Sequence, residues 1–164
     1  MSSLPAVQIR PERADHPAVV AMLGALDAYL ASLYAPEDNH ILDVQALLQP
    51  GIDFLVAEQG GVIVGCGASR TMPGEVDTGG AAYGEIKRMF VQPAARGQRI
   101  AEQLLQMLEQ RLAERGVHLA TLETGKDQLE AVRLYERCGY VRRAAFGGYP
   151  DNGLSLFLEK HLSA

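Results

Sequence analysis

The stretch that decides the fold runs from Tyr83 to Gly116 and reads YGEIKRMFVQPAARGQRIAEQLLQMLEQRLAERG. The part up to Gln92 is rich in β-branched and aromatic side chains and is stopped by Pro93, which predicts a strand that ends there. From Ile100 the apolar residues recur with the period of an amphipathic helix. Gly116 stands where a left-handed residue commonly ends a helix. The stretch therefore predicts a strand, a tight loop and a long helix.

The loop between this strand and helix has the composition of an anion-binding site. It reads Ala94-Ala95-Arg96-Gly97-Gln98-Arg99. A glycine-containing loop that opens a helix directs unpaired backbone N–H groups and the positive end of the helix dipole at one place. Two arginines add side-chain charge. The loop is therefore predicted to bind phosphate, and a diphosphate in particular.

Length and composition are those of a soluble globular protein rather than of a nucleic-acid or membrane protein. The 164 residues, 48% of them hydrophobic and 21% charged, predict a single domain spanning residues 1–164. A net charge of -5 argues against nucleic-acid and anionic-membrane partners. Without a long apolar run or a signal-peptide pattern, the expected location is cytoplasmic. Cys66 and Cys138 are expected to be buried free thiols, and no metal-binding motif occurs.

The residues before the central stretch predict a strand, two helices and a hairpin. Asp15 can cap the first helix, with Pro17 in its first turn. Gly60-Gly61 joins two strand-like runs, which is a hairpin signal. Gly65 and Gly67 in the second run indicate the close approach of another element. The expected elements are a strand at 7–10, a helix with its apolar stripe at 19–33, a short helix at 43–48, and strands at 52–58 and 62–71.

The residues around and after the central stretch complete a layered α/β domain on a mixed sheet. Residues 73–80 are expected to form a solvated turn that carries Glu75 and Asp77. A strand at 118–123 should run parallel to the central strand, because a helix connects them. Asp127 to Glu130 has capping-box spacing and starts a helix that ends at Gly139. Two closing strands are expected at 140–146 and 154–162.

Two motifs resemble those of the GCN5-related N-acetyltransferase (GNAT) family. RMFVQPAARGQRIAEQLL resembles motif A, whose pattern Q/R-x-x-G-x-G/A wraps the pyrophosphate of acetyl-coenzyme A. It maps onto Arg96, Arg99 and Ala101, so an arginine replaces the middle glycine. EAVRLYERCGYV resembles the second signature, N-x-x-A-x-x-L-Y-x-x-x-G-F, with Gln128 in place of the asparagine.

The resemblance implies an acetyl-coenzyme A-dependent N-acetyltransferase that acts on a primary amine, expected to be a small molecule, by direct transfer. It implies a GNAT-like α/β (α+β) fold, a mixed and mostly antiparallel sheet of about seven strands with about four helices. In the family, the pantetheine arm of the cofactor pairs with the central strand. The implied cofactor-binding residues are Met89, Phe90, Val91, Arg96, Gly97, Gln98, Arg99, Ile100, Ala101, Gln128 and Tyr135.

Tyr135 is the candidate general acid. A phenol with a reference pKa of about 10 is protonated at neutral pH and can donate its proton to the departing thiolate. The alternative is a core tyrosine, because Leu129, Val132 and Tyr135 share a helix face. The resemblance to motif A upstream favours the acid.

Glu85 is the candidate general base, through the resemblance to members with a glutamate on this strand. Strict strand alternation places Glu85, Lys87, Met89 and Val91 on one face and Ile86, Arg88 and Phe90 on the other. The alternative role is a carboxylate paired with Lys87 or Arg88, and the sequence leaves both open.

The acceptor end of the site is implied to involve the segment 34–40 and the central strand. The candidate residues are Tyr34, Asn39, His40, Lys87 and Arg88. Arg70 is a further candidate, together with Lys87 and Arg88, for binding a carboxylate on the acceptor. A non-catalytic acyl-coenzyme A sensor and a protein lysine or N-terminal acetyltransferase are the alternative functions. Family members are often dimers, so a homodimer is a possible assembly.

Overall fold

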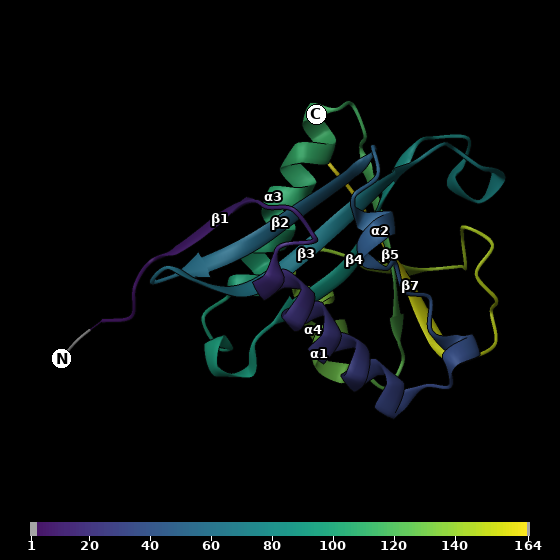
Figure 1. Cartoon of the computed structure of the whole chain (residues 1–164). Helices are drawn as coiled ribbons and strands as arrows, with labels where there is room; N and C mark the ends of the chain where they lie inside the picture. The colour runs from purple at the N-terminus through teal and green to yellow at the C-terminus, as the bar shows by residue number, and fades with distance from the viewer. Residues whose placement is uncertain (1–2, 164) are drawn as a thin grey trace. The chain divides into compact units, whose positions relative to one another are not determined.

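The computed structural model describes residues 3–163, which form four α-helices, three short 3₁₀ helices and seven strands (Figure 1). The α-helices are α1 (Pro17–Leu33), α2 (Val44–Leu47), α3 (Ile100–Glu114) and α4 (Leu129–Arg137). The strands are β1 (Val7–Pro11), β2 (Ile52–Gln59), β3 (Val62–Met72), β4 (Tyr83–Val91), β5 (Leu119–Gly125), β6 (Val141–Arg143) and β7 (Ser155–His161). The 3₁₀ helices are η1 (Pro36–Asp38), η2 (Val76–Thr78) and η3 (Pro93–Ala95).

The strands belong to one sheet in the order β1-β2-β3-β4-β5-β7-β6. The β1–β2, β5–β7 and β6–β7 ladders are antiparallel, and the β4–β5 ladder is parallel. The predicted fold class, a mixed and mostly antiparallel sheet with four helices, is confirmed. The expected strand at 140–146 is the one element that is much shorter than predicted, because only Val141–Arg143 pairs with β7.

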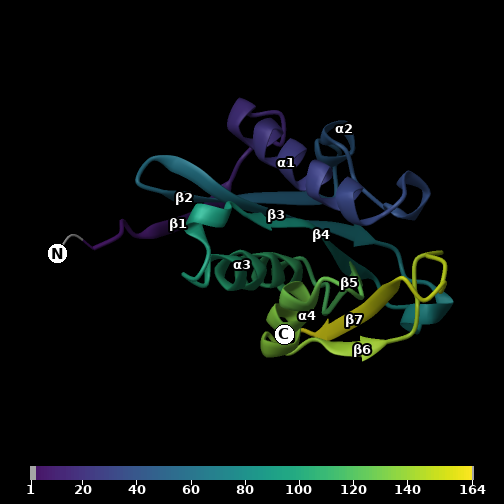
Figure 2. The ribbon, with the colours of Figure 1, turned by 90° about the horizontal axis from the view of Figure 1, so that it is seen from below.

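The chain divides into two compact units, the first of which comprises Met1–Ala68 and Lys87–Leu108. Within it, α1 lies on one side of β3 and the first half of α3 on the other (Figure 2). Cys66 and Ala68 are buried in a core with residues of α1. A Cβ atom on Gly65 or Gly67, which alternate with them along the strand, would stand 3.4 Å from Leu104 or 3.3 Å from Leu108 of α3. The nearest atoms at the two positions belong to Phe90 and Met89 of β4, so the predicted close approach is that of β4 as well as α3.

The second unit comprises Ser69–Ile86 and Glu109–Ala164. Its aromatic core contains Tyr83, Phe146 and Phe157, with the Phe146 ring 5.7 Å from Tyr83 and 5.8 Å from Phe157 in edge-to-face contacts. A polar cluster is buried in the same unit. Glu109 accepts hydrogen bonds of 2.9 Å from Tyr140 and of 2.9 Å from Lys160, so both oxygens of its carboxylate are engaged.

Three local expectations are corrected by side-chain contacts. His16 caps α1, through its Nδ1 atom and the amide of Ala18, because Asp15 is paired with Arg13. The capping box expected from Asp127 does not form, because the N-cap of α4 is Gln128, which makes no side-chain capping bond. Glu75 is not a solvated turn residue.

The carboxylate of Glu75 accepts hydrogen bonds from the amide of Gly147 at 2.6 Å and from the hydroxyl of Tyr83 at 3.3 Å.

Of the two thiols, Cys66 is buried as expected, whereas Cys138 is only half-buried. None of the helices formed by residues 3–163 has the length and apolar character needed to cross a membrane.

Two glycines give opposite predictions for the same substitution. A Cβ on Gly84 would clash with both Cδ atoms of the fully buried Leu112, so we expect Gly84→Ala to cost about 1–3 kcal/mol of unfolding free energy. A Cβ on the helical Gly24 would meet nothing within 4 Å, so Gly24→Ala should gain about 0.5–1 kcal/mol. Urea denaturation of both variants measures this difference, and equal effects would contradict the packing at Gly84.

Candidate active site

The loop between β4 and α3 has a backbone suited to binding an anion. Its φ angles alternate in sign, with values of -70° at Arg96, +84° at Gly97 and +59° at Arg99, and Gln98 is not among the residues of positive φ. Alternation of this kind turns successive N–H groups toward one side of the chain. The amide of Gln103 donates to the carbonyl of Arg99, so the amides before it belong to the open first turn of α3.

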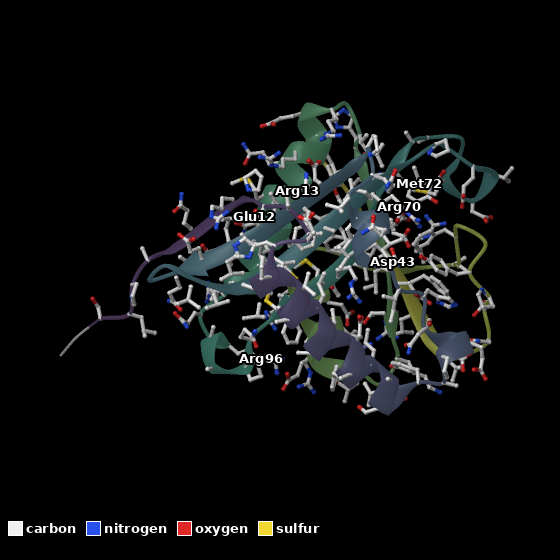
Figure 3. All side chains as sticks on the ribbon, viewed as in Figure 1. Glu12, Arg13, Asp43, Arg70, Met72 and Arg96 are labelled. Atoms are coloured by element: carbon white, nitrogen blue, oxygen red, sulfur yellow. The ribbon has the colours of Figure 1, made fainter. Side chains whose placement is uncertain are left out.

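Two side chains of the loop between β4 and α3 are held by other protein groups, and a third is exposed. Arg96, labelled in Figure 3, donates from its Nε atom to the carbonyl of Val91 at 3.0 Å, and its guanidinium lies 5.8 Å from the ring centre of Phe90. Gln98 bridges the carbonyl of Ala95 and the side chain of Gln59. Arg99 is exposed and forms no ion pair within residues 3–163. Its charge is therefore available to a ligand, and its positive φ explains why a glycine is usual at this position of the motif.

β4 lies between β3 and β5 in the sheet order. Its parallel ladder with β5 contains the pairs Gly84↔Ala120 and Glu85↔Thr121, in the second unit. In the first unit, the amide of Gln92, just after β4, donates to the carbonyl of Val64 on β3.

The predicted alternation along β4 is wrong at Arg88. Its φ is +59°, and it breaks the period of two, so that Lys87 and Arg88 both contact the segment from α1 to His40. Met89 lies on the α3 side, where a Cβ on Gly67 would clash with its sulfur, while Phe90 packs against the α1 core. A strand irregularity of this type re-aims the side chains that follow it.

The candidate acceptor residues are placed in the first unit. The Nζ atom of Lys87 donates to the carbonyl of His40 at 2.9 Å. Asn39 and Tyr34 flank η1. Tyr34, Asn39 and His40 are all half-buried. The Arg88 side chain is only 4% exposed and is paired with Asp27 at 2.5 Å. Arg88 is thus held as a structural cation in this arrangement.

Glu85 is buried in the second unit, and two residues that the sequence did not suggest as its partners hold it. Its Oε1 atom accepts a hydrogen bond of 2.7 Å from Arg70, and its Oε2 atom accepts one from the hydroxyl of Tyr149. Arg70, labelled on β3 in Figure 3, is about one third exposed, whereas the Glu85 side chain is 2% exposed. The carboxylate therefore has charge compensation and a second donor.

Tyr135 lies on the buried face of α4, also in the second unit. Its ring meets that of Tyr140 edge-to-face at 5.9 Å. Burial raises the pKa of Tyr135, so its phenol is protonated throughout the neutral range. Its hydroxyl forms no hydrogen bond with any residue between 3 and 163. Gln128, the N-cap of the same helix, is half-buried.

Tyr149 is the site residue that sequence reasoning missed, since Arg70 was considered only as a binder of an acceptor carboxylate. The available signal was the Gly147-Gly148 pair, which indicates a tight turn just before a tyrosine. No sequence pattern pairs this turn with Glu85, because the two are far apart in the chain. The part of the chain that the structure describes holds no group of His, Cys, Asp or Glu residues suited to a metal ion.

Comparison with known proteins identifies the family. The sequence profile of the acetyltransferase (GNAT) family matches residues 21–140, and the chain belongs to this family. The chain is 45% identical to a protein named IAA acetyltransferase from Azospirillum brasilense, over 97% of this chain and 100% of the relative. The predicted N-acetyltransferase class is thereby confirmed.

Solved structures agree with this membership. A Klebsiella pneumoniae protein assigned as an acyl-CoA N-acyltransferase superposes with a TM-score of 0.76 at 34% identity, over 96% of this chain and 98% of that one. The PaiA N-acetyltransferase of Thermoplasma acidophilum, crystallised with coenzyme A, superposes with a TM-score of 0.69 at 14% identity, over 95% and 99% of the two chains. The latter likeness concerns the fold.

Proposed function

We propose that this chain acts as one catalytic domain that transfers the acetyl group of acetyl-coenzyme A directly to a primary amine of a small molecule. The observation that carries the proposal is the alternating backbone of Arg96 to Arg99 at the start of α3. Family membership supports acetyl transfer, and the fold relative crystallised with coenzyme A supports the choice of donor.

The residues of the loop fit a diphosphate. The backbone amides from Gly97 to Ala101 supply donors without helical acceptors, and Arg99 supplies an exposed positive charge. The backbone groups of β4 at Met89 to Val91 are proposed to pair with the amides of a pantetheine arm, as an added strand would. When bound, acetyl-coenzyme A supplies an activated thioester whose acetyl group the amine can attack.

Two side chains of the second unit have the properties that the proton transfers require. Tyr135 has a protonated phenol without a protein partner, so it can give its proton to the leaving thiolate. Glu85 has a buried carboxylate, which accepts hydrogen bonds from Arg70 and from Tyr149. We assign Tyr135 as the general acid and Glu85 as the general base, acting on the amine directly or through a water molecule.

The acceptor is proposed to be a small molecule. The name of the Azospirillum relative refers to a small acceptor, which supports this class. We place the acceptor near Tyr34, Asn39 and His40 of the segment 34–40 and near Lys87 of β4. Acetylation of a protein lysine or N-terminus is the alternative within the class, and peptides in the acceptor panel test it.

The decisive experiment incubates the protein with acetyl-coenzyme A and a panel of amines, polyamines, amino acids and peptides while free thiol release is followed. Cofactor binding with amine-dependent thiol release supports the transferase and gives the acceptor class. Tight binding without release over the whole panel would instead support a sensor. A protein that does not bind acetyl-coenzyme A at all would overturn the assignment of the loop.

The charge of Arg99 gives a separate prediction. We expect Arg99→Gly and Arg99→Ala to weaken acetyl-coenzyme A binding to a similar degree, about five- to tenfold, because both remove one charge-assisted contact. Glycine accepts the positive φ without strain, so any excess loss in Arg99→Ala measures the backbone contribution. Calorimetric titration with acetyl-coenzyme A measures both. Unchanged affinity in Arg99→Gly would mean that the guanidinium does not touch the diphosphate.

A further inference from the structure

Tyr149 donates a short hydrogen bond to the buried carboxylate of the proposed base. We propose that Tyr149 is the positioning residue of Glu85, and that its phenol keeps this carboxylate charged and correctly oriented to receive a proton. The proposal rests on the assignment of Glu85 as the base. It concerns a residue outside both sequence motifs, on the loop between β6 and β7.

The two oxygens of Glu85 are held by different donors from different segments. Arg70 of β3 donates to Oε1 at 2.7 Å, and the Tyr149 hydroxyl donates to Oε2. Glu85 itself is 1% exposed, so water cannot replace a lost donor without entering the protein interior. Arg70 is partly exposed. Tyr149 reaches the carboxylate from the loop between β6 and β7. Together the two donors fix the plane of the carboxylate.

The hydrogen bond from Tyr149 persists over the working pH range of an enzyme. Burial and the negative charge of Glu85 raise the pKa of Tyr149, and Glu123 adds to this effect. The phenol therefore stays protonated and remains a donor. The other titratable groups near Glu85 include Arg70 on β3 and Tyr83 on its own strand, and β5 contributes the uncharged Thr121. Tyr149 thus complements the charged donor Arg70 with a neutral one.

The loop places the phenol through a defined set of contacts. Gly147 and Gly148 have φ angles of +63° and +76°, which allow the chain to turn sharply before Tyr149. The amide of Gly147 is bound at 2.6 Å by Glu75, the residue expected from the sequence to be solvated. The Tyr149 ring packs at 5.6 Å on Phe146 and at 6.2 Å on Phe157. These contacts make Glu75 the support of the loop that presents Tyr149.

The test uses Tyr149→Phe in the full chain, which removes only the hydroxyl. Losing a donor loosens the carboxylate and disfavours its charged form, so we expect kcat to fall about tenfold and the acidic limb of the kcat–pH profile to move to higher pH. The KM for acetyl-coenzyme A should stay within about twofold. Tyr29→Phe, at an exposed tyrosine of α1, is the matched control.

Two further variants separate this inference from the proposed function. Glu75→Ala should lower kcat as Tyr149→Phe does but by less, because the loop loses one support and keeps its aromatic packing. Glu85→Gln should abolish the acidic limb. An unchanged kcat and an unmoved limb in Tyr149→Phe would overturn the inference and leave the transferase intact. Full turnover in Glu85→Gln would overturn the base, and with it the positioning role.

Discussion

Replacing Tyr135 with phenylalanine is expected to lower kcat about 100-fold while acetyl-coenzyme A binds within about threefold of its normal affinity. The reason is that the substitution removes a proton donor and almost no packing. The ring is buried and contacts Tyr140, and these contacts survive in phenylalanine. The hydroxyl has no partner among residues 3–163, so no protein hydrogen bond is lost with it. Steady-state kinetics with the best acceptor, together with calorimetry, measure both quantities.

A core role for Tyr135 predicts the opposite pattern. If packing were its function, Tyr135→Phe would leave kcat unchanged, and Tyr135→Ala would reduce stability and cofactor binding together. Tyr140→Phe is the comparison at a neighbouring tyrosine of the same aromatic contact. It removes a hydrogen bond to the buried Glu109, so it should reduce stability by about 1–2 kcal/mol with a much smaller effect on kcat.

Replacing Asp27 with alanine is expected to cost about 2–3 kcal/mol of unfolding free energy, because it leaves the buried Arg88 guanidinium without its carboxylate. The value lies at the low end for broken buried pairs, since the Asp27 side chain is 47% exposed and its attraction is partly screened. For a chain of this size, the melting temperature should fall by roughly 5–10 °C. Urea or thermal denaturation gives the value.

Two controls show whether charge burial is the cause. Asp27→Asn keeps a hydrogen-bond acceptor and should lose less than Asp27→Ala. The double variant Asp27→Leu with Arg88→Met removes both charges and should recover most of the loss. A double variant no more stable than Asp27→Ala would mean that the irregular strand at Arg88, rather than its charge, sets the cost.

The order and type of the elements were predictable because their signals are local. Pro93 ends β4, Gly116 follows the end of α3, and Gly60-Gly61 joins β2 to β3, all as expected. Each of these residues acts through its own backbone preference, the freedom of glycine or the restriction of proline, which does not depend on distant parts of the chain. The loop proposed to bind the diphosphate was predictable for the same reason, because its glycine and the start of its helix are neighbours in sequence.

The errors arose where a side chain is held by a distant partner. Glu75 was expected to face solvent, yet it binds Gly147. The partners Arg70 and Tyr149, which bind the two oxygens of Glu85, were not among those that the sequence suggested. The capping position of α1 shifted to His16 because Arg13 engages Asp15. A charged side chain can pair with any of several residues that are similarly near in sequence, and the fold determines which of them lies within reach.

The amino-acid sequence by itself determined the family, the sheet and helix order, and the residues of the loop that starts α3, since short-range backbone preferences and apolar periodicity suffice for these. Only the tertiary structure decided the surroundings of Glu85 and the irregularity at Arg88. Strict alternation is the local preference of a strand, and the positive φ at Arg88 departs from it where the strand carries a buried ion pair with α1. Long-range contacts of this kind leave no periodic trace in the chain, so they become visible only when the strands and loops are assembled.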